Sequence, residues 1–373
     1  MIYFKKVENF IFLSSKISFS LLTIFLMLLK SGIWVMPTFE QSFIIAQNPF
    51  TNTFTDGEHF LFWNWLGPFI AYMIGIKHFF LYFIFHLFFS ISFLLLFIEL
   101  CFKNLTERNA RVALIIFLAL PASFTSFFWV GYDSITLFLL LLSFRYRRNI
   151  FILLPVGILL GMQHFEQSFF ASFGIFMSVV FNFLYNKKIT KQILFPFILL
   201  CGVIIGRLLL QIIFNYYGIH INNGRLNWLQ NHLSFLLNTF LLHFYTIIWS
   251  IFSLGWIVLL KYIKFKNKSL TFLIALFLVS LIVIISGDQT RVIAIITFPL
   301  LLYYILLNDE FLFTITNQEV SIFFLTWLIM PISWVWGGKG MWSLLPYDLK
   351  LVASLIKHGN IHWSVNSAWL PFY

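Results

Sequence analysis

The side chains that could carry out chemistry are mostly ionisable groups placed between long apolar runs. The stretch from residue 37 to 59 holds three carboxylates, Glu40, Asp56 and Glu58, and no Lys or Arg occurs between Lys30 and Lys77. Carboxylates suit proton transfer, because they can take a proton from a hydroxyl group as it attacks. A plain turn is the competing interpretation of the Asp-Gly-Glu sequence at residues 56–58.

Four later stretches carry the other candidate groups. They contain Asp133 in GYDSITLF, His164 and Glu166 in GMQHFEQSFF, Arg225 between His220 and His232, and Asp288 with Arg291 in SGDQTRVIAIITFP. Each of these groups except Arg225 has a purely structural alternative. Asp133 could cap a helix, Asp288 and Arg291 could pair across one helical turn, and His164 and Glu166 could lie in an exposed loop.

Motifs for several other chemistries are absent from the sequence. There is no Gly-rich phosphate loop followed by Lys and Ser or Thr, and no Gly-x-Ser-x-Gly elbow. His358 and His362 lack the Glu of a zinc-protease helix, and Cys101 and Cys201 both lie in apolar runs. Carboxylates and cations therefore remain, and together they suit an anionic, lipid-borne substrate.

The composition indicates the class of protein whose fold must position these groups. The chain has 373 residues, of which 61% are hydrophobic and only 10% charged, and its mean hydropathy is +0.92. Soluble domains have about 25% charged residues, so this composition excludes a soluble globule and a disordered chain. We expect an all-α, polytopic transmembrane helical bundle. The net charge of +11 then reflects basic cytoplasmic loops rather than binding to nucleic acid.

The apolar runs and their interruptions predict eleven spans. They cover residues 17–36, 79–102, 111–130, 134–146, 150–163, 168–186, 193–214, 235–260, 269–286, 292–307 and 319–336. With the N-terminus inside, sixteen of the 24 basic residues fall in inward segments, as the positive-inside rule requires. Residues 60–76 are apolar but rich in Trp, and we expect a membrane-surface helix there.

This topology predicts one catalytic unit and one tail. Residues 1–336 form the transmembrane bundle, with a first outward loop at 37–78, and residues 337–373 form an outward tail. All five stretches with candidate groups become outward connections. An ionisable group at membrane depth needs a polar cavity or a partner. The sequence therefore predicts a single outward-facing site.

Several of these stretches resemble the GT-C superfamily, the multi-span glycosyltransferases that use polyprenyl-phosphate-linked sugars. The resemblance lies in FEQSFIIAQNP at 39–49, HFLFWNWLGP at 59–68, Asp133, and the basic connection RYRR at 145–148. It covers about 170 N-terminal residues and extends further by topology only. The family's loop often opens with paired acids, whereas here Phe39 precedes Glu40, which leaves the identity of the base open. The family also often has Lys where His164 and Glu166 stand.

The resemblance implies an inverting transfer of a sugar to a glycan or lipid acceptor. Glu40 would be the first choice of base, followed by Asp56 and Glu58. Arg291, then Arg225 and Arg207, would stabilise the leaving phosphate. The remaining substrate-binding roles would fall to His164, which would donate to the phosphate, and to Asp133, Glu166 and Asp288, which would orient the acceptor or hold the cations.

The implied setting is polysaccharide biosynthesis at a bacterial inner membrane, with the site facing the periplasm or exterior. The partners would be a lipid-linked sugar donor, a glycan or lipid acceptor and membrane lipids, without nucleic acid. No cofactor is required, although three acids in one loop leave a divalent cation open.

Three other functions fit parts of the pattern. An O-antigen or capsule repeat-unit polymerase shares the substrate class, but it often relies on arginines in two large outward loops. A lipid-linked glycan flippase or transporter would favour matching halves and helices broken at mid-membrane. A membrane acyltransferase would need a central catalytic His, for which His164 is the candidate.

Overall fold

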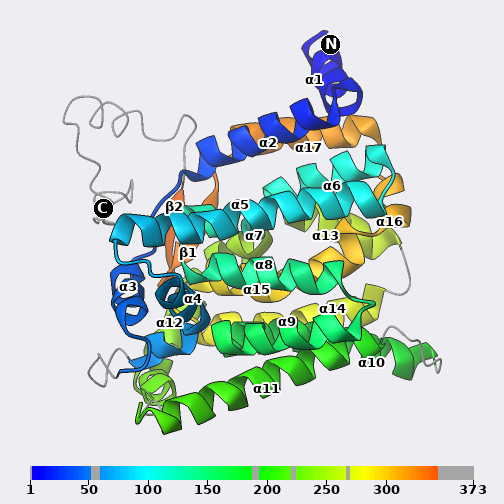
Figure 1. Ribbon diagram of the computed structural model, residues 1–373. Helices are drawn as coiled ribbons and strands as arrows, with labels where there is room; N and C mark the ends of the chain where they lie inside the picture. Colours follow the sequence, from blue (N-terminus) through cyan, green and yellow to red (C-terminus); the bar gives the residue numbers. More distant parts are fainter. Residues whose placement is uncertain (1, 52–58, 187–192, 220–223, 266–268, 343–373) are drawn as a thin grey trace.

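The computed structural model describes residues 2–51, 59–186, 193–219, 224–265 and 269–342. The first half of the chain contains α1 (Ile2–Leu13), α2 (Lys16–Ser31), α3 (Phe39–Gln47), the 3-10 helix η1 (His59–Asn64), α4 (Leu66–Met73), α5 (Phe79–Asn104), α6 (Glu107–Ala119), α7 (Pro121–Phe128), α8 (Tyr132–Arg145) and α9 (Ile150–Gln163). The long helices lie side by side along a common direction (Figure 1).

The second half continues the same bundle. It contains α10 (Phe165–Asn186), α11 (Leu194–Tyr216), α12 (Gly224–Phe252), α13 (Gly255–Phe265), α14 (Ser269–Ser280), the 3-10 helix η3 (Leu281–Ile285), α15 (Gln289–Leu301), the π-helix η4 (Leu302–Leu306), α16 (Asp309–Phe313), α17 (Asn317–Ile329) and strands β1 (Ser333–Trp336) and β2 (Lys339–Trp342). Apart from this hairpin, the regular structure of the described residues is helical, which confirms the predicted helical bundle.

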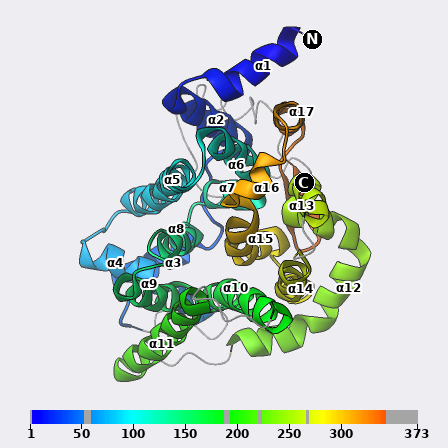
Figure 2. The ribbon, with the colours of Figure 1, turned by 90° about the vertical axis from the view of Figure 1, so that its right-hand side faces the viewer.

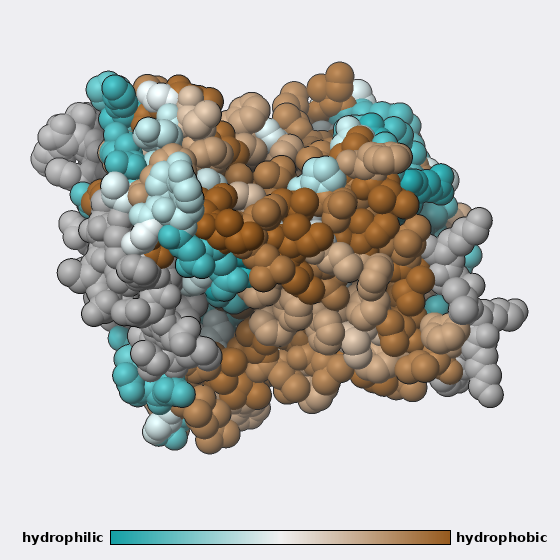
Figure 3. Space-filling model, turned by 60° about the horizontal axis from the view of Figure 1, so that its bottom comes forward, coloured by the Kyte–Doolittle hydropathy of each residue, from teal (hydrophilic) through white to brown (hydrophobic). Residues whose placement is uncertain are grey.

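Length and hydropathy identify several helices that could cross a membrane. Within the described residues, five helices are long and apolar enough on their own, and the number rises to seven if two bent pairs each count as one span. The middle of the face in Figure 3 is hydrophobic, and its hydrophilic residues gather toward the two ends. This distribution fits an integral membrane protein whose apolar belt faces lipid.

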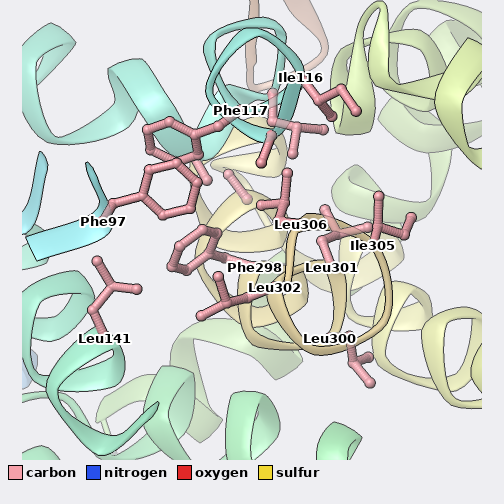
Figure 4. Packing of buried hydrophobic residues seen from close by; sticks show 14 of the residues in the cluster. Phe97, Ile116, Phe117, Leu141, Phe298, Leu300, Leu301, Leu302, Ile305 and Leu306 are labelled. Carbon is pink, nitrogen blue, oxygen red and sulfur yellow. The ribbon is translucent and has the colours of Figure 1, made fainter. Parts of the chain in front are cut away.

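The core is centred on α15, which is surrounded by other helices in the end-on view (Figure 2). The α15 sequence VIAIITFPLL has no polar face, so every side of this helix can be buried. The rings of Phe97, Phe117 and Phe298 face one another beside it (Figure 4), and the Phe97 and Phe117 ring centroids lie 3.9 Å apart. These contacts join α5, α6 and α15.

Four glycines bring α9 and α11 into close contact. Gly157 and Gly161 on α9 face Gly202 and Gly206 on α11. A Cβ atom on Gly161 would lie 2.1 Å from the Val203 carbonyl oxygen. Small residues spaced four apart allow the backbones of membrane helices to approach in this way. The crossing fixes the end of α9, where His164 follows.

The two ends of the bundle carry different side chains. We call one the basic end: it holds the ion pairs of Glu107 with Lys16 and Arg111, of Arg145 with Glu99 and of Lys261 with Glu319. These pairs lie in, or at the span ends next to, the segments that the sequence places in inward connections. We call the other the hairpin end, because it holds β1 and β2 and the connections before α8, α10 and α15 (Figure 1).

Three details at the hairpin end differ from the predicted spans. The first span, predicted at 17–36, is helical only to Ser31, because Gly32 follows with φ of 67°. The next residues are extended and pair with the end of α7 through a Val35–Val130 bridge. The last span, predicted at 319–336, ends at Ile329, and the chain then forms the hairpin. Gly337 and Gly338 both have positive φ, which suits a two-residue hairpin turn.

The predicted surface segment 60–76 is not one continuous helix. It comprises η1 and the eight-residue α4, which packs against α3 and α9. The predicted first outward loop also contains α3, within the stretch 39–49 that carries the family resemblance. Both helices lie at the hairpin end (Figure 1).

Candidate functional site

The candidate site is centred on an arginine between two aspartates. The Arg291 Nη1 atom donates to Asp133 Oδ2 at 2.7 Å, and its Nε atom donates to Asp288 Oδ2. Asp133 lies in the first turn of α8 and Asp288 lies directly before α15, so the starts of two helices position the two carboxylates. Asp133 is fully buried, and the other two side chains are 12–13% exposed. We call these three residues the Asp–Arg–Asp cluster.

The sequence left two interpretations of Asp288 and Arg291 open, a local ion pair and a role in a shared site, and the cluster combines both. The two residues do pair across one turn, and Arg291 also reaches an aspartate 158 positions earlier in the chain. Asp288 occupies the N-cap position of α15 but makes no capping hydrogen bond with its side chain. Its carboxylate therefore serves the ion pair.

Aromatic side chains form one side of the cluster. The Arg291 guanidinium lies 5.8 Å from the Trp129 ring centroid and 5.7 Å from that of Tyr132. The Trp336 ring, 46% exposed, lies 5.8 Å from Trp129. Strand β1 holds this wall in place, because Val335 N–H donates to Thr290 Oγ1 at 2.9 Å, one residue before Arg291.

Gln163 supports the cluster from the end of α9. Its Nε2 atom donates to the Tyr132 carbonyl at 2.9 Å, and its Oε1 atom accepts from Gly67 N–H at 2.9 Å. The side chain is fully buried and thereby ties α4 and α9 to the residue before Asp133. The sequence reasoning missed Gln163. A polar residue at the end of an apolar span was the available signal.

The cluster keeps two buried acceptor atoms. Among the described residues, Asp133 Oδ1 and Asp288 Oδ1 have no hydrogen-bond partner. Buried polar atoms are nearly always paired, so such atoms require an explanation. Carboxylate oxygens beside an aromatic wall, of which the Trp336 ring is exposed, can accept hydrogen bonds from a hydroxyl-rich ligand whose apolar face stacks on that ring.

His164 and Glu166 lie next to the cluster. His164 Nδ1 is 3.5 Å from Glu166 Oε2, and the His164 ring lies 6.1 Å from that of Tyr132. His164 is 7% exposed, so it does not belong to an exposed loop. It stands at the break between α9 and α10, where its φ of −156° interrupts the helix.

Arg207, on α11, lies close to the residue that follows His164. Its guanidinium lies 3.0 Å from the Trp63 ring centroid and 5.3 Å from that of Phe165, the residue after His164. A guanidinium between aromatic faces keeps its charge while its apolar surface is covered. Arg207 is thus a second fixed cation at the hairpin end.

Among the described residues, one further predicted residue lies outside the cluster. Glu40 is exposed in the first turn of α3, four residues after Met36, whose sulfur lies 3.9 Å from Arg291 Nη1. Asp56 and Glu58 lie outside the described residues. Arg225 is in the first turn of α12, but its side chain lies outside the described part of the structure. The structure therefore brings Asp133, Asp288 and Arg291 together, and not Glu40.

No family model, no curated protein and no solved structure matches this chain. Metal binding also has no identified ligand set: in the part of the chain that the structure describes, no group of three or more His, Cys, Asp or Glu residues could hold a metal ion. Function must be inferred from the site itself.

Burial raises the pKa of the Asp288 carboxyl to about 6, although Arg291 opposes this rise. An aspartate in an unfolded chain has a pKa of about 4, so the folded protein binds this proton more tightly. The contribution of Asp288 to stability should therefore decrease as the pH rises from about 4 to about 6. We expect Asp288→Asn to remove this decrease, so that the unfolding temperature of the variant rises relative to that of the unmodified chain as the pH rises through this window.

Thermal unfolding of the purified protein at pH 4.5 and pH 7 would measure this effect. Glu8→Gln, in α1 at the opposite end, is the control and should keep the dependence of the unmodified chain. An Asp288→Asn variant with an unchanged slope would show that Asp288 does not hold the proton.

Proposed function

We propose that the protein is a membrane glycosyltransferase that acts at the hairpin end. In this proposal it crosses the membrane eleven times with its N-terminus in the cytoplasm, and the hairpin end faces the periplasm or exterior. The donor is a sugar on a polyprenyl phosphate, and the acceptor is a glycan or a lipid. The observation that carries the proposal is the Asp–Arg–Asp cluster, with its two buried acceptor oxygens and its aromatic wall.

The charge of the cluster favours hydroxyl groups over phosphate. One guanidinium is shared by two carboxylates, so the cluster has no excess positive charge when both carboxylates are ionised. A phosphate beside it would meet two like charges. We therefore assign Asp133 and Asp288 to the hydroxyls of a sugar, and Arg291 to holding these carboxylates in position.

The leaving phosphate then needs another cation. Arg207 is suited to this role, because Phe165 and His164 connect it to Tyr132 beside the cluster. Its planar guanidinium can donate two parallel hydrogen bonds to phosphate oxygens. His164 can donate a further hydrogen bond to the same group, and Arg225 is the alternative cation.

The reaction is a displacement at C1 of the donor sugar. An acceptor hydroxyl oxygen forms the new bond to C1 while the bond from C1 to the phosphate oxygen breaks, and the phosphate leaves with the electron pair. A carboxylate takes the hydroxyl proton. Glu40 is our first choice, because it is exposed on the helix that follows Met36, with Asp56 and Glu58 as alternatives.

The test is transfer from a polyprenyl-phosphate-linked, radiolabelled hexose by the full-length protein in proteoliposomes. Loss of a general base lowers the rate by about 10²–10⁴-fold. We expect a loss of this size in Glu40→Gln or, if the base is elsewhere in the loop, in Asp56→Asn or Glu58→Gln. Glu8→Gln should keep full activity. Full activity in all three loop variants would contradict the proposed mechanism.

A further inference from the structure

An apolar crevice lies between three helices that the proposed reaction does not use. It is lined by α6, α13 and α17 and has a volume of about 220 Å³. Both α13 and α17 pack against α6, and Figure 2 shows them on the same flank of the bundle, with α6 inward of both. Its lining includes exposed side chains on α13 and α17, so the crevice opens toward the outside of the bundle.

The floor and rim of the crevice differ in exposure. Val112, Ile115 and Val320 form a buried floor. On the rim, Ile257 is 54% exposed and Ile322 is 50% exposed. These rim residues belong to the apolar belt, so the groups that can fill the crevice come from the hydrocarbon part of the bilayer.

The crevice ends at a lysine at the basic end. Lys261 Nζ lies 2.5 Å from Glu319 Oε1, and this ion pair bridges α13 and α17. Glu319 also accepts from Thr316 N–H through Oε2 at 2.7 Å, so it is held in place by its own helix. Lys261 has two more N–H groups, and Lys264 lies exposed one turn later on α13.

The length of the crevice matches part of one leaflet. From Glu319 to Thr326, α17 advances by about 10 Å, given its rise of about 1.5 Å per residue. Half of a bilayer core measures about 15 Å. An acyl chain that enters beside Lys261 would therefore remain within the leaflet at the basic end, far from the Asp–Arg–Asp cluster.

We propose that this crevice holds an acyl chain of an anionic phospholipid, whose headgroup phosphate binds Lys261. The apolar lining selects a chain, and Lys261 at its end selects the negative charge. The proposal does not depend on the glycosyltransferase activity, because the site lies at the opposite end of the bundle.

The test measures lipid binding to the full-length protein in a neutral detergent. Phosphatidylglycerol and phosphatidylcholine with identical chains are added, and bound lipid is counted by native mass spectrometry. We expect tighter binding of phosphatidylglycerol. Lys261→Gln should remove most of this preference. The affinity for phosphatidylglycerol should fall about fivefold, the effect of losing one basic residue near an anionic lipid. Glu319→Gln should preserve or increase it, because Lys261 is released from its partner.

A second variant tests the crevice independently of the charge. Ile322→Trp should fill the crevice and weaken the binding of both lipids, whereas Ile274→Trp, at a 37% exposed position on α14, should change neither. Equal binding of the two lipids, or a preference unchanged in Lys261→Gln, would overturn the headgroup assignment. Unaltered binding in Ile322→Trp would overturn the assignment of the crevice.

Discussion

Arg291→Met is expected to destabilise the protein more than other single changes at the hairpin end. The substitution keeps most of the side-chain volume but leaves Asp133 and Asp288 without their shared counterion. Breaking a buried ion pair by removing one partner costs about 3–5 kcal/mol. Thermal unfolding in detergent, followed by the loss of monodisperse protein, would measure this effect.

Two further variants separate the folding role of the cluster from its functional role. Arg291→Lys should recover only part of the stability, because one ammonium cannot donate to both carboxylates with the geometry of a guanidinium. The triple change Asp133→Asn, Asp288→Asn and Arg291→Gln removes all charges together and should recover much of the stability. It should still lack sugar transfer if the carboxylates bind hydroxyl groups.

The stability of Arg291→Met alone decides whether the cluster is as buried as the structure indicates. If this variant unfolds at the same temperature as the unmodified protein, water already hydrates the two carboxylates, and the loss of Arg291 leaves no unpaired buried charge. The assignment of their free oxygens to a ligand would then have no basis.

The helices were predictable because each depends on a local run of apolar residues. The predicted spans 79–102, 168–186 and 193–214 correspond to α5, α10 and α11 within a few residues. The meeting of Asp133 with Arg291 was also implied, since alternating helices return successive outward connections to one end of a bundle. The number of spans and their orientation in a membrane stay predictions.

Several features depend on partners that are distant in the sequence. Buried Lys30 donates to the carbonyls of Trp327, Leu328 and Met330 at the end of α17, about 300 residues later. A lone lysine at the end of a span gives no sign of that partner. Gln163 is similar, because its two partners lie on α4 and at the start of α8. The hairpin had a local signal, the Gly337-Gly338 pair, which the hydropathy of the preceding run concealed.

The glycine crossing of α9 and α11 gives the second large effect. In Gly161→Ala the new methyl group would lie 2.1 Å from the Val203 carbonyl oxygen, and in Gly206→Ala it would lie 2.1 Å from that of Ile158. Both obstacles are backbone atoms, so the helices themselves must separate. Overpacking costs about 1–3 kcal/mol, and we expect each variant at the upper end of this range. Thermal unfolding of the single and double variants would test this.

The control for these variants adds more atoms to α11 without a clash. Ile205→Phe lies beside Gly206 but at a 38% exposed position, and it should leave the unfolding temperature nearly unchanged. Helix propensity alone predicts the opposite order, because Ala favours a helix over Gly by about 1 kcal/mol. A higher unfolding temperature in Gly161→Ala would therefore show that the two backbones are not in contact. The position of Arg207 next to Trp63 depends on this crossing, so a double variant that still folds should also lose the proposed phosphate site.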